Sequence, residues 1–160
     1  KSKGNNFERK MANLLSERFA EYLGIEKGFR RNQDSGSYFG GSNSQRTQTH
    51  SMDYAVFGDL ICPKAFKFSI ECKHYKTAPS LQSILDQNVK EWNTWLGQAQ
   101  QDADNSNKKL ALIVKYNKIE ELVFLSDTIV NYEQAFKYNS YSIYKLKTFL
   151  EQPNEFFFEK

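Results

Sequence analysis

The sequence predicts an α/β sandwich in which a central mixed sheet is flanked by helices, with the element order α-β-β-β-α-β. Apolar residues recur at helical spacing over 5–23 and 81–103, which indicates two amphipathic helices. Between and after them, the runs 54–61, 66–74 and 110–116 are alternating or continuously apolar, as strands are. Helices and strands in this order pack as layers around a shared sheet.

The first helix is expected to begin at Asn5 and to end at Leu23, because Gly24 can terminate it. Its apolar stripe consists of Phe7, Met11, Leu14, Leu15, Phe19 and Tyr22. Residues 25–31 are expected to form a short edge strand. Segment 32–52 is rich in Ser, Gly, Asn, Gln and Thr. A polar loop of that length inside a compact domain is usually functional or disordered.

The next two strands carry the most informative pattern in the chain. Side chains alternate between the two faces of a strand, so in 66–74 Glu71 and Lys73 would project together from a strand with an apolar opposite face. The strand predicted before it leads into a turn at Pro63-Lys64, which indicates a hairpin. Such a hairpin would bring Asp59 beside Glu71.

The second half of the chain is expected to alternate helices and strands. Ser80 is suited to cap the long helix, and Trp92 and Trp95 lie on the apolar stripe of that helix, where we expect them in the core. The later elements are strands at 110–116 and 121–125, a shorter helix at 126–137, a strand at 141–146 and the aromatic run Phe156–Phe158. One of the tryptophans, or this aromatic run, could instead contribute to a dimer interface.

Composition limits the class of protein. The 160 residues suffice for one hydrophobic core, so we expect a single domain over 1–160. The net charge of +3 and the pI of about 8.7 permit nucleic-acid binding without requiring it. No apolar stretch approaches the roughly 20 residues of a membrane span, and two cysteines cannot alone build a tetrahedral zinc site. These features favour a reduced, intracellular protein.

The acidic pair and the lysine suggest metal-dependent chemistry. Hydrolysis of a phosphodiester needs an activated water and neutralisation of charge at phosphorus, and Mg²⁺ provides both. Asp59 and Glu71 would be bridging ligands for one or two ions, with Mn²⁺ as a substitute metal. The backbone carbonyl of Cys72 would be a further ligand. Lys73 would orient or deprotonate the attacking water, or stabilise the developing charge.

Asp59 followed by Glu71-Cys72-Lys73 matches the D…(D/E)-x-K signature, and the chain resembles the PD-(D/E)xK nuclease superfamily. It is also similar to archaeal-type Holliday junction resolvases in two further segments. Gly4–Arg9 resembles the G-x-x-x-E-R start of their first helix, and Asp34-Ser35-Gly36 resembles the Ser-Gly of their catalytic loop. One departure is Gly58, which stands where the superfamily signature has proline.

The resemblance implies a restriction-endonuclease-like fold and a Mg²⁺-dependent DNA endonuclease that cuts four-way junctions as a homodimer. It implies that Glu8 completes the metal site and that Ser35 contacts the strand being cut as a catalytic residue. It also suits a phage or mobile-element relative that acts inside a bacterial, archaeal or phage-infected cell.

Polar and basic residues around the predicted site would contact the DNA, because arginine forks and other donors pair with phosphate oxygens. A glutamine on the long helix is included because in the superfamily such a glutamine reaches the active site. The predicted DNA-contacting residues are Arg30, Arg31, Ser35, Arg46, His74, Lys76 and Gln98. Asp53 stays open as a rival carboxylate, although a turn residue is its simpler interpretation, and the spacing of His50 and His74 gives no zinc motif.

Three other functions stay open from the sequence. The first is a less structure-selective phage or restriction-like endonuclease. The second is a non-catalytic DNA-binding module of the same fold, whose binding would depend on salt but would lead to no cutting. The third is a protein-interaction domain, which would be favoured if Asp59 and Glu71 lay far apart or were paired with surface lysines.

Overall fold

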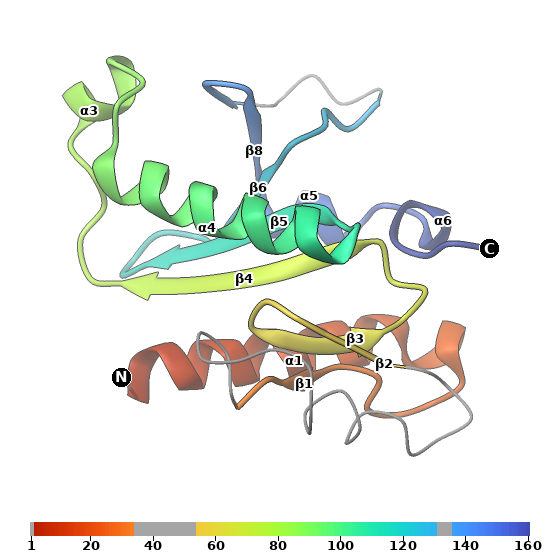
Figure 1. The fold of residues 1–160 in the computed structure, drawn as a ribbon. Helices are drawn as coiled ribbons and strands as arrows, with labels where there is room; N and C mark the ends of the chain where they lie inside the picture. Colours follow the sequence, from red (N-terminus) through yellow and green to blue (C-terminus); the bar gives the residue numbers. More distant parts are fainter. Residues whose placement is uncertain (1, 34–53, 131–135) are drawn as a thin grey trace.

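The computed structural model describes residues 2–33, 54–130 and 136–160 and shows a mixed α/β architecture (Figure 1). Its centre is a five-stranded sheet with the order β4-β5-β6-β8-β7. The strands are β4 Phe68–Tyr75, β5 Lys109–Tyr116, β6 Leu122–Leu125, β7 Phe136–Tyr138 and β8 Tyr141–Lys145. β4 and β5 are parallel, and the other neighbouring pairs are antiparallel. The predicted sandwich with a central mixed sheet is therefore confirmed.

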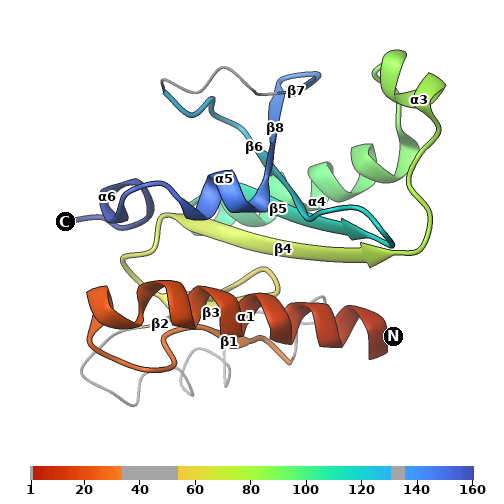
Figure 2. The ribbon, with the colours of Figure 1, turned by 180° about the vertical axis from the view of Figure 1, so that it is seen from behind.

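Helices and a smaller sheet cover the central sheet on its two sides. The small antiparallel sheet has the order β1-β3-β2, with β1 Arg30–Arg31, β2 Tyr54–Phe57 and β3 Leu60–Pro63. The helices are α1 Ser2–Leu23, α3 Leu81–Leu85, α4 Lys90–Ser106, α5 Leu146–Leu150 and α6 Asn154–Phe157. Both views of the ribbon place α1 and the small sheet on one side of β4 and α4 on the other (Figures 1 and 2).

The core consists of two apolar clusters that meet at the central sheet. Met11, Leu15 and Phe19 of α1 belong to the first cluster, together with alternate residues of β4 and β5. Trp92 and Trp95 of α4 belong to the second cluster, on the other face of β5, so their predicted place in the core is confirmed. β5 is the only one of these two strands that is apolar on both faces, as expected of a strand covered on both sides.

The helix α1 follows its sequence pattern closely. It is amphipathic, with Phe7 and the residues one turn apart from it buried, while Tyr22 stays 49% exposed. It ends where predicted, because Gly24 takes a φ of +72° and its N–H donates to the carbonyl of Ala20 at 2.8 Å. Glycine adopts this left-handed conformation without steric cost.

The predicted hairpin between 54–61 and 66–74 is wrong. β2 instead pairs with β3, and only Gly58 and Asp59 connect these two strands. Gly58 has a φ of +64°, and glycine at the first central position suits the II′ class of two-residue hairpin turn. The turn therefore interrupts the long predicted strand, and Asp59 lies in a turn rather than on a strand.

The long helix predicted over 81–103 is divided into α3 and α4. The division lies near Gln87, which has a φ of +56°, and none of the residues of α3 is buried. Leu81 and Leu85 are 71% and 66% exposed, so they do not continue the apolar stripe of α4. The capping prediction is confirmed, because the hydroxyl of Ser80 accepts a hydrogen bond from the N–H of Ser83 at 3.1 Å.

The helix predicted over 126–137 is also wrong in its described part. Residues 126–130 form no helix, 136–137 open β7, and 131–135 lie outside the described residues. Residues 136–138 form a strand because they pair with β8, with Phe136 opposite Ile143 and Tyr138 opposite Tyr141. Tyr138 is fully buried, while Phe136 at the start of the strand is 47% exposed. The hydroxyl of Tyr138 accepts a hydrogen bond from the N–H of Val89 at 2.8 Å, which ties β7 to the start of α4.

The aromatic run near the C-terminus belongs to the core. Phe157 and Phe158 are buried in the first cluster, and Phe158 forms an isolated bridge with Phe66. These two rings are therefore taken up by the fold and are not available to a second copy of the chain.

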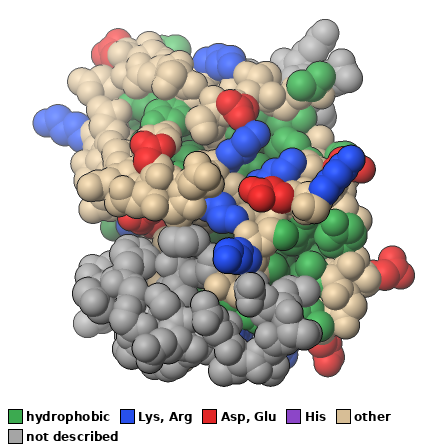
Figure 3. Space-filling model, turned by 45° about the vertical axis from the view of Figure 1, so that its right-hand side comes forward, with side chains coloured by type: hydrophobic (Ala, Val, Ile, Leu, Met, Phe, Trp, Pro, Cys, Tyr) green, Lys and Arg blue, Asp and Glu red, His purple; other side chains and the backbone are tan. Residues whose placement is uncertain are grey.

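The surface shows no uniform charge on the face turned forward in Figure 3. In the described part of that face, basic and acidic side chains lie next to one another among apolar ones. Within the described ranges, no helix is both long enough and apolar enough to cross a bilayer.

Candidate functional site

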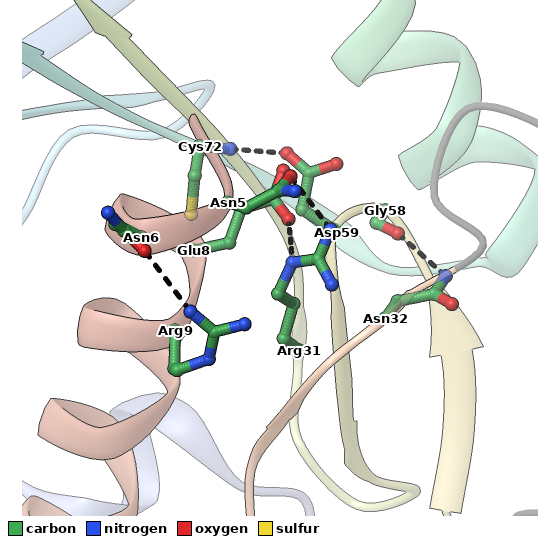
Figure 4. A network of polar contacts seen from close by, with 9 residues as sticks. All are labelled: Asn5, Asn6, Glu8, Arg9, Arg31, Asn32, Gly58, Asp59 and Cys72. Atoms are coloured by element: carbon green, nitrogen blue, oxygen red, sulfur yellow. Dashed lines mark hydrogen bonds and ion pairs between the residues drawn. The ribbon is translucent and has the colours of Figure 1, made fainter. Parts of the chain in front are cut away.

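The turn between β2 and β3 docks on the free edge of β4. One edge of β4 is paired with β5, and Asp59 binds the other edge through two hydrogen bonds. Its N–H donates to the carbonyl of Ile70 at 2.9 Å, and its Oδ2 accepts from the N–H of Cys72 at 2.7 Å (Figure 4). Asp59 therefore lies next to Glu71, as the sequence predicts, although a different turn brings it there.

Asn32 fixes this turn from the end of β1. Its backbone N–H donates to the carbonyl of Asp59 at 2.8 Å, and its Nδ2 donates to the carbonyl of Gly58 at 3.1 Å (Figure 4). The side chain is buried, where a satisfied amide holds its partners in one geometry. Sequence reasoning missed Asn32, because an asparagine at the start of a polar loop looks like an ordinary turn residue.

Gly58 lets the turn approach the carboxyl group of Glu71. A Cβ atom at this position would lie 2.6 Å from Oε2 of Glu71 and 2.5 Å from the carbonyl oxygen of Ile70. The position also needs a positive φ, which proline cannot adopt. These two facts explain why glycine stands where the superfamily signature has proline.

Glu71 is a buried acid without a full set of partners. It is 8% exposed, and its Oε2 has no hydrogen-bond partner among the described residues. Burial, the neighbouring Asp59 and a contact with Asp102 of α4 raise the pKa of Glu71 well above its usual value, against the opposing effect of the Lys73 ammonium. An ionised carboxylate is costly in such surroundings unless a cation joins it.

Glu8 approaches the same edge from α1. It is 9% exposed, and its Oε1 accepts from Nε of Arg31 at 2.8 Å (Figure 4). The Nη2 of Arg31 donates to Oδ1 of Asn5 at 2.7 Å. Burial and the charge of Asp59 raise the pKa of Glu8, while Arg31 lowers it. Carboxyl groups from α1, the turn and β4 therefore lie close enough to affect one another's ionisation.

The donor set at this edge suits a hard divalent cation. The N–H and C=O of one strand residue point to the same neighbour, so the carbonyl of Cys72 lies on the side of Asp59. The Cys72 thiol is buried in the opposite cluster, and burial raises its pKa, so only the backbone of this residue is available. In the described part of the chain, no three acidic, histidine or cysteine side chains form a closed metal cage. Two carboxylates with a carbonyl and waters are sufficient for Mg²⁺.

Lys73 projects from β4 on the same face as Glu71. It is half-buried and lowers the pKa of both Glu71 and Glu8 through its charge. The ammonium of Lys73 therefore lies near the carboxyl groups of Glu71 and Glu8. This position corresponds to the last residue of the Glu71-Cys72-Lys73 motif.

The residues predicted to contact DNA have different surroundings in the structure. His74 contacts Phe7 edge-to-face with ring centroids 5.5 Å apart, and its Nε2 lies 3.3 Å from Oδ1 of Asn117. Lys76 and Gln98 are exposed. The guanidinium of Arg30 lies 5.3 Å from the centre of the Tyr54 ring. The predictions for Ser35 and Arg46, like those for Asp53 and His50, fall outside the described residues.

Asp102 is the second residue that sequence reasoning missed. From α4, one turn after Gln98, it contributes to the raised pKa of Glu71. The only signal was its position four residues after Gln98 and one before the buried Ala103, at the margin of the apolar stripe that packs on the sheet.

The comparisons with known proteins agree with this geometry. A profile of the family described as "Phage putative PDDEXK endonuclease" matches residues 1–158. No curated protein and no solved structure matches the chain. The match spans the acidic edge of β4 and both clusters of the core, and the chain belongs to this phage PDDEXK endonuclease family.

Proposed function

We propose that the protein is a Mg²⁺-dependent DNA endonuclease that hydrolyses phosphodiester bonds at the free edge of β4. The observation that supports it most is the buried Oε2 of Glu71, which has no hydrogen-bond partner among the described residues although Asp59 lies beside it. Asp59, Glu71 and the carbonyl of Cys72 would hold the metal, with Glu8 completing the site. Mn²⁺ would substitute for Mg²⁺.

When bound, the metal supplies charge neutralisation at phosphorus and a more acidic water. The protein's own side chains position the metal ligands, the attacking water and the phosphate. The N–H of Cys72 donates to Oδ2 of Asp59, which fixes this carboxyl group beside Glu71. Lys73 would orient the attacking water or neutralise charge on the phosphate in the transition state. Arg31 would favour the ionised form of Glu8, against the effect of burial.

A basic cleft on the α1 side of β4 supports DNA as the substrate. Its volume is about 410 Å³, and it lies where the start of α1 meets the ends of β4 and β5. The cleft is lined by Lys3, Asn6, Phe7, Lys10, His74 and Lys115. Because neighbouring strand residues point to opposite faces, His74 and the cleft lie on the α1 face of β4, opposite Glu71 and Lys73. One of its lysines, Lys10, is paired with Glu121 at 3.5 Å. DNA that extends from the metal site around the end of β4 would meet the ammonium groups of this cleft.

Further contacts to the DNA come from the sequence. Arg30, Arg31, Ser35, Arg46, Lys76 and Gln98 would make further contacts to the DNA. The likeness to Holliday junction resolvases supports branched DNA as the preferred substrate and a homodimer that cuts two strands symmetrically. The activity would belong to one nuclease domain formed by 1–160 and acting inside the cell. Membership of a phage endonuclease family supports a less structure-selective nuclease as the second candidate.

The test compares four DNA substrates of matched sequence: a four-way junction, a flap, a linear duplex and a single strand. Each is incubated with the protein and Mg²⁺, Mn²⁺ or EDTA. Paired nicks confined to the junction would support the resolvase, and cutting of all substrates would support the less selective nuclease. Salt-dependent binding without metal-dependent cutting would overturn the proposal in favour of a non-catalytic module.

The matched variants are Glu71→Gln and Glu120→Gln. Glu120 is exposed and pairs with Lys145 at 3.3 Å, so its loss should leave cleavage unchanged. Glu71→Gln should abolish cleavage and keep DNA binding, because it removes a metal ligand without changing the shape of the side chain.

A further inference from the structure

We propose that Tyr75, at the end of β4, is a stacking platform for an unpaired nucleobase next to the phosphate that is cut. This inference rests on the proposed function and deepens it, because it names the kind of DNA that the site would hold. A base inside a duplex is covered on both faces by its neighbours. A protein ring that stacks on a base therefore selects DNA in which that nucleotide is unpaired or turned out of the helix.

Tyr75 lies on the same face of β4 as the residues of the proposed active site. Glu71, Lys73 and Tyr75 are alternate residues of this strand, so their side chains project to one side. The contact of Tyr75 with Trp95 identifies that side as the one covered by α4. At about 3.3 Å per strand residue, Tyr75 lies roughly 13 Å along β4 from Glu71. A DNA strand cut at Glu71 and running along this face would bring a neighbouring base to the ring.

The ring of Tyr75 is packed on one side and open elsewhere. Its centroid lies 5.0 Å from that of Trp95, and the two planes meet at 32°, which is closer to stacked than to edge-to-face geometry. Trp95 is 7% exposed and belongs to the α4 cluster of the core, whereas Tyr75 is 50% exposed. A ring that is already held by its neighbour loses little freedom when a base stacks on it.

Basic groups flank this ring in the chain. Lys73 precedes it on the same face of β4, and the exposed Lys76 follows it directly. Sites for single-stranded nucleic acid combine such cations, which hold phosphates, with aromatic rings on which bases stack. Stacking is tolerant of sequence because every base has a π-face, so we expect the site to accept any base.

Tyr22 has the same local geometry as Tyr75 but a different place in the fold. Its ring lies 5.0 Å from that of Phe158 at an angle of 33°, and it is 49% exposed. It lies near the end of α1, however, about 21 Å along the helix from Glu8 at 1.5 Å per residue. Only the position beside Glu71 and Lys73 sets Tyr75 apart, which makes Tyr22 the matched control.

The experiment measures the affinity for two probes of equal length, an oligothymidylate and the same sugar-phosphate chain without bases, by fluorescence anisotropy in EDTA. The wild type should bind the oligothymidylate more tightly. Tyr75→Leu should reduce this preference at least about fivefold and leave the affinity for the base-free chain unchanged. Tyr75→Phe, which keeps the ring, and Tyr22→Leu should keep the wild-type preference.

Three outcomes would overturn the inference. The wild type could bind the two probes equally, Tyr75→Leu could keep the preference or weaken both probes by the same factor, or Tyr75→Phe could lose the preference as Tyr75→Leu does. In each case, Mg²⁺-dependent cleavage by the wild type would leave the proposed function standing, because binding is measured without metal. A preference that depends on Tyr75 in a protein that cuts no DNA would support the stacking site and overturn the proposed function.

Discussion

β4 and β5 are neighbouring parallel strands that contribute differently to the molecule. Leu110 to Val114 of β5 are all fully buried and apolar. β4 carries Glu71 and Lys73 in register with Leu112 and Val114, although α4 covers the same face of both strands. The difference is the free edge: β5 is hydrogen-bonded on both sides, and β4 has one side open to the turn that carries Asp59. A strand can hold buried charges where such an edge lets ions and substrate reach them.

Of the substitutions that test the difference between β4 and β5, Glu71→Gln in β4 is expected to have the largest effect on cleavage. The variant should lower the rate of cleavage at least about a thousandfold, because stabilisation of charge by a bound metal is worth several kcal/mol. Single-turnover cleavage assays at saturating protein measure it. Retained Mg²⁺-dependent cutting would show that the edge of β4 is not the active site.

Leu112→Ala in β5 should have the opposite outcome. Removing a fully buried leucine side chain should lower the free energy of unfolding by about 2–5 kcal/mol, with cleavage per folded molecule retained. Denaturant titration measures the loss. Val130→Ala is the control, since Val130 is 81% exposed and should change stability by no more than about 0.5 kcal/mol. Equal losses in the two variants would contradict the role assigned to β5.

Gly58→Ala tests the approach of the turn to β4. The substitution forces a positive φ on a residue with a Cβ and drives that atom into the carbonyl of Ile70 and the carboxyl of Glu71. We expect a loss of about 1–3 kcal/mol in stability and weaker Mn²⁺ binding. Gly97→Ala is the matched control. Its Cβ would meet no atom within 4 Å in the middle of α4, where alanine is favoured over glycine by roughly 0.5–1 kcal/mol.

The buried acid of β4 should make the stability of the protein depend on pH, which the apolar residues of β5 cannot do. Burial and the neighbouring Asp59 raise the pKa of Glu71 in the folded state above its ordinary value of 4.5, so the folded chain binds more protons than the unfolded chain above that pH. The stability of the metal-free protein should therefore fall as pH rises above about 4.5, by at most about 1.4 kcal/mol per pH unit for this one group. Thermal melts should show that Glu71→Gln, or added Mg²⁺, reduces the fall. A wild type and variant with parallel pH profiles would contradict this.

The smallest effect is expected from single lysines of the basic cleft. Lys115→Gln removes one charge next to His74, and it should weaken DNA binding a few-fold and reduce the slope of log affinity against log salt by about 0.9 for duplex DNA. Lys147→Gln, in α5, should change neither quantity. Fluorescence anisotropy at several salt concentrations measures both. If Lys115→Gln leaves the salt slope unchanged, the cleft does not bind DNA phosphates.

The sequence predicted the features that depend on local periodicity. The stripe of α1, the buried run of β5 and the alternation around Glu71 each have a pattern within one element. The nearness of Asp59 to Glu71 was also foreseen, but from a hairpin that does not form. The turn that forms instead requires a glycine at position 58, because the backbone has a positive φ there and lies close to β4.

Other features depend on contacts between distant segments. Asn32 and Asp102 come near the site only because β1 and α4 pack against its elements. No pattern within one helix or strand predicts this packing. Residues 136–137 of the predicted helix instead open β7, where Tyr138 accepts a hydrogen bond from Val89, far away in the sequence. Long-range packing of this kind overrides intrinsic propensity.

The most direct test is a crystal of the wild-type protein soaked with Mn²⁺ and measured at a wavelength where manganese scatters anomalously. The account predicts an anomalous peak at the free edge of β4, about 2.1 Å from an oxygen of Asp59 and from an oxygen of Glu71. A structure in which manganese binds elsewhere, with these two carboxyl groups sharing no ion, would contradict it.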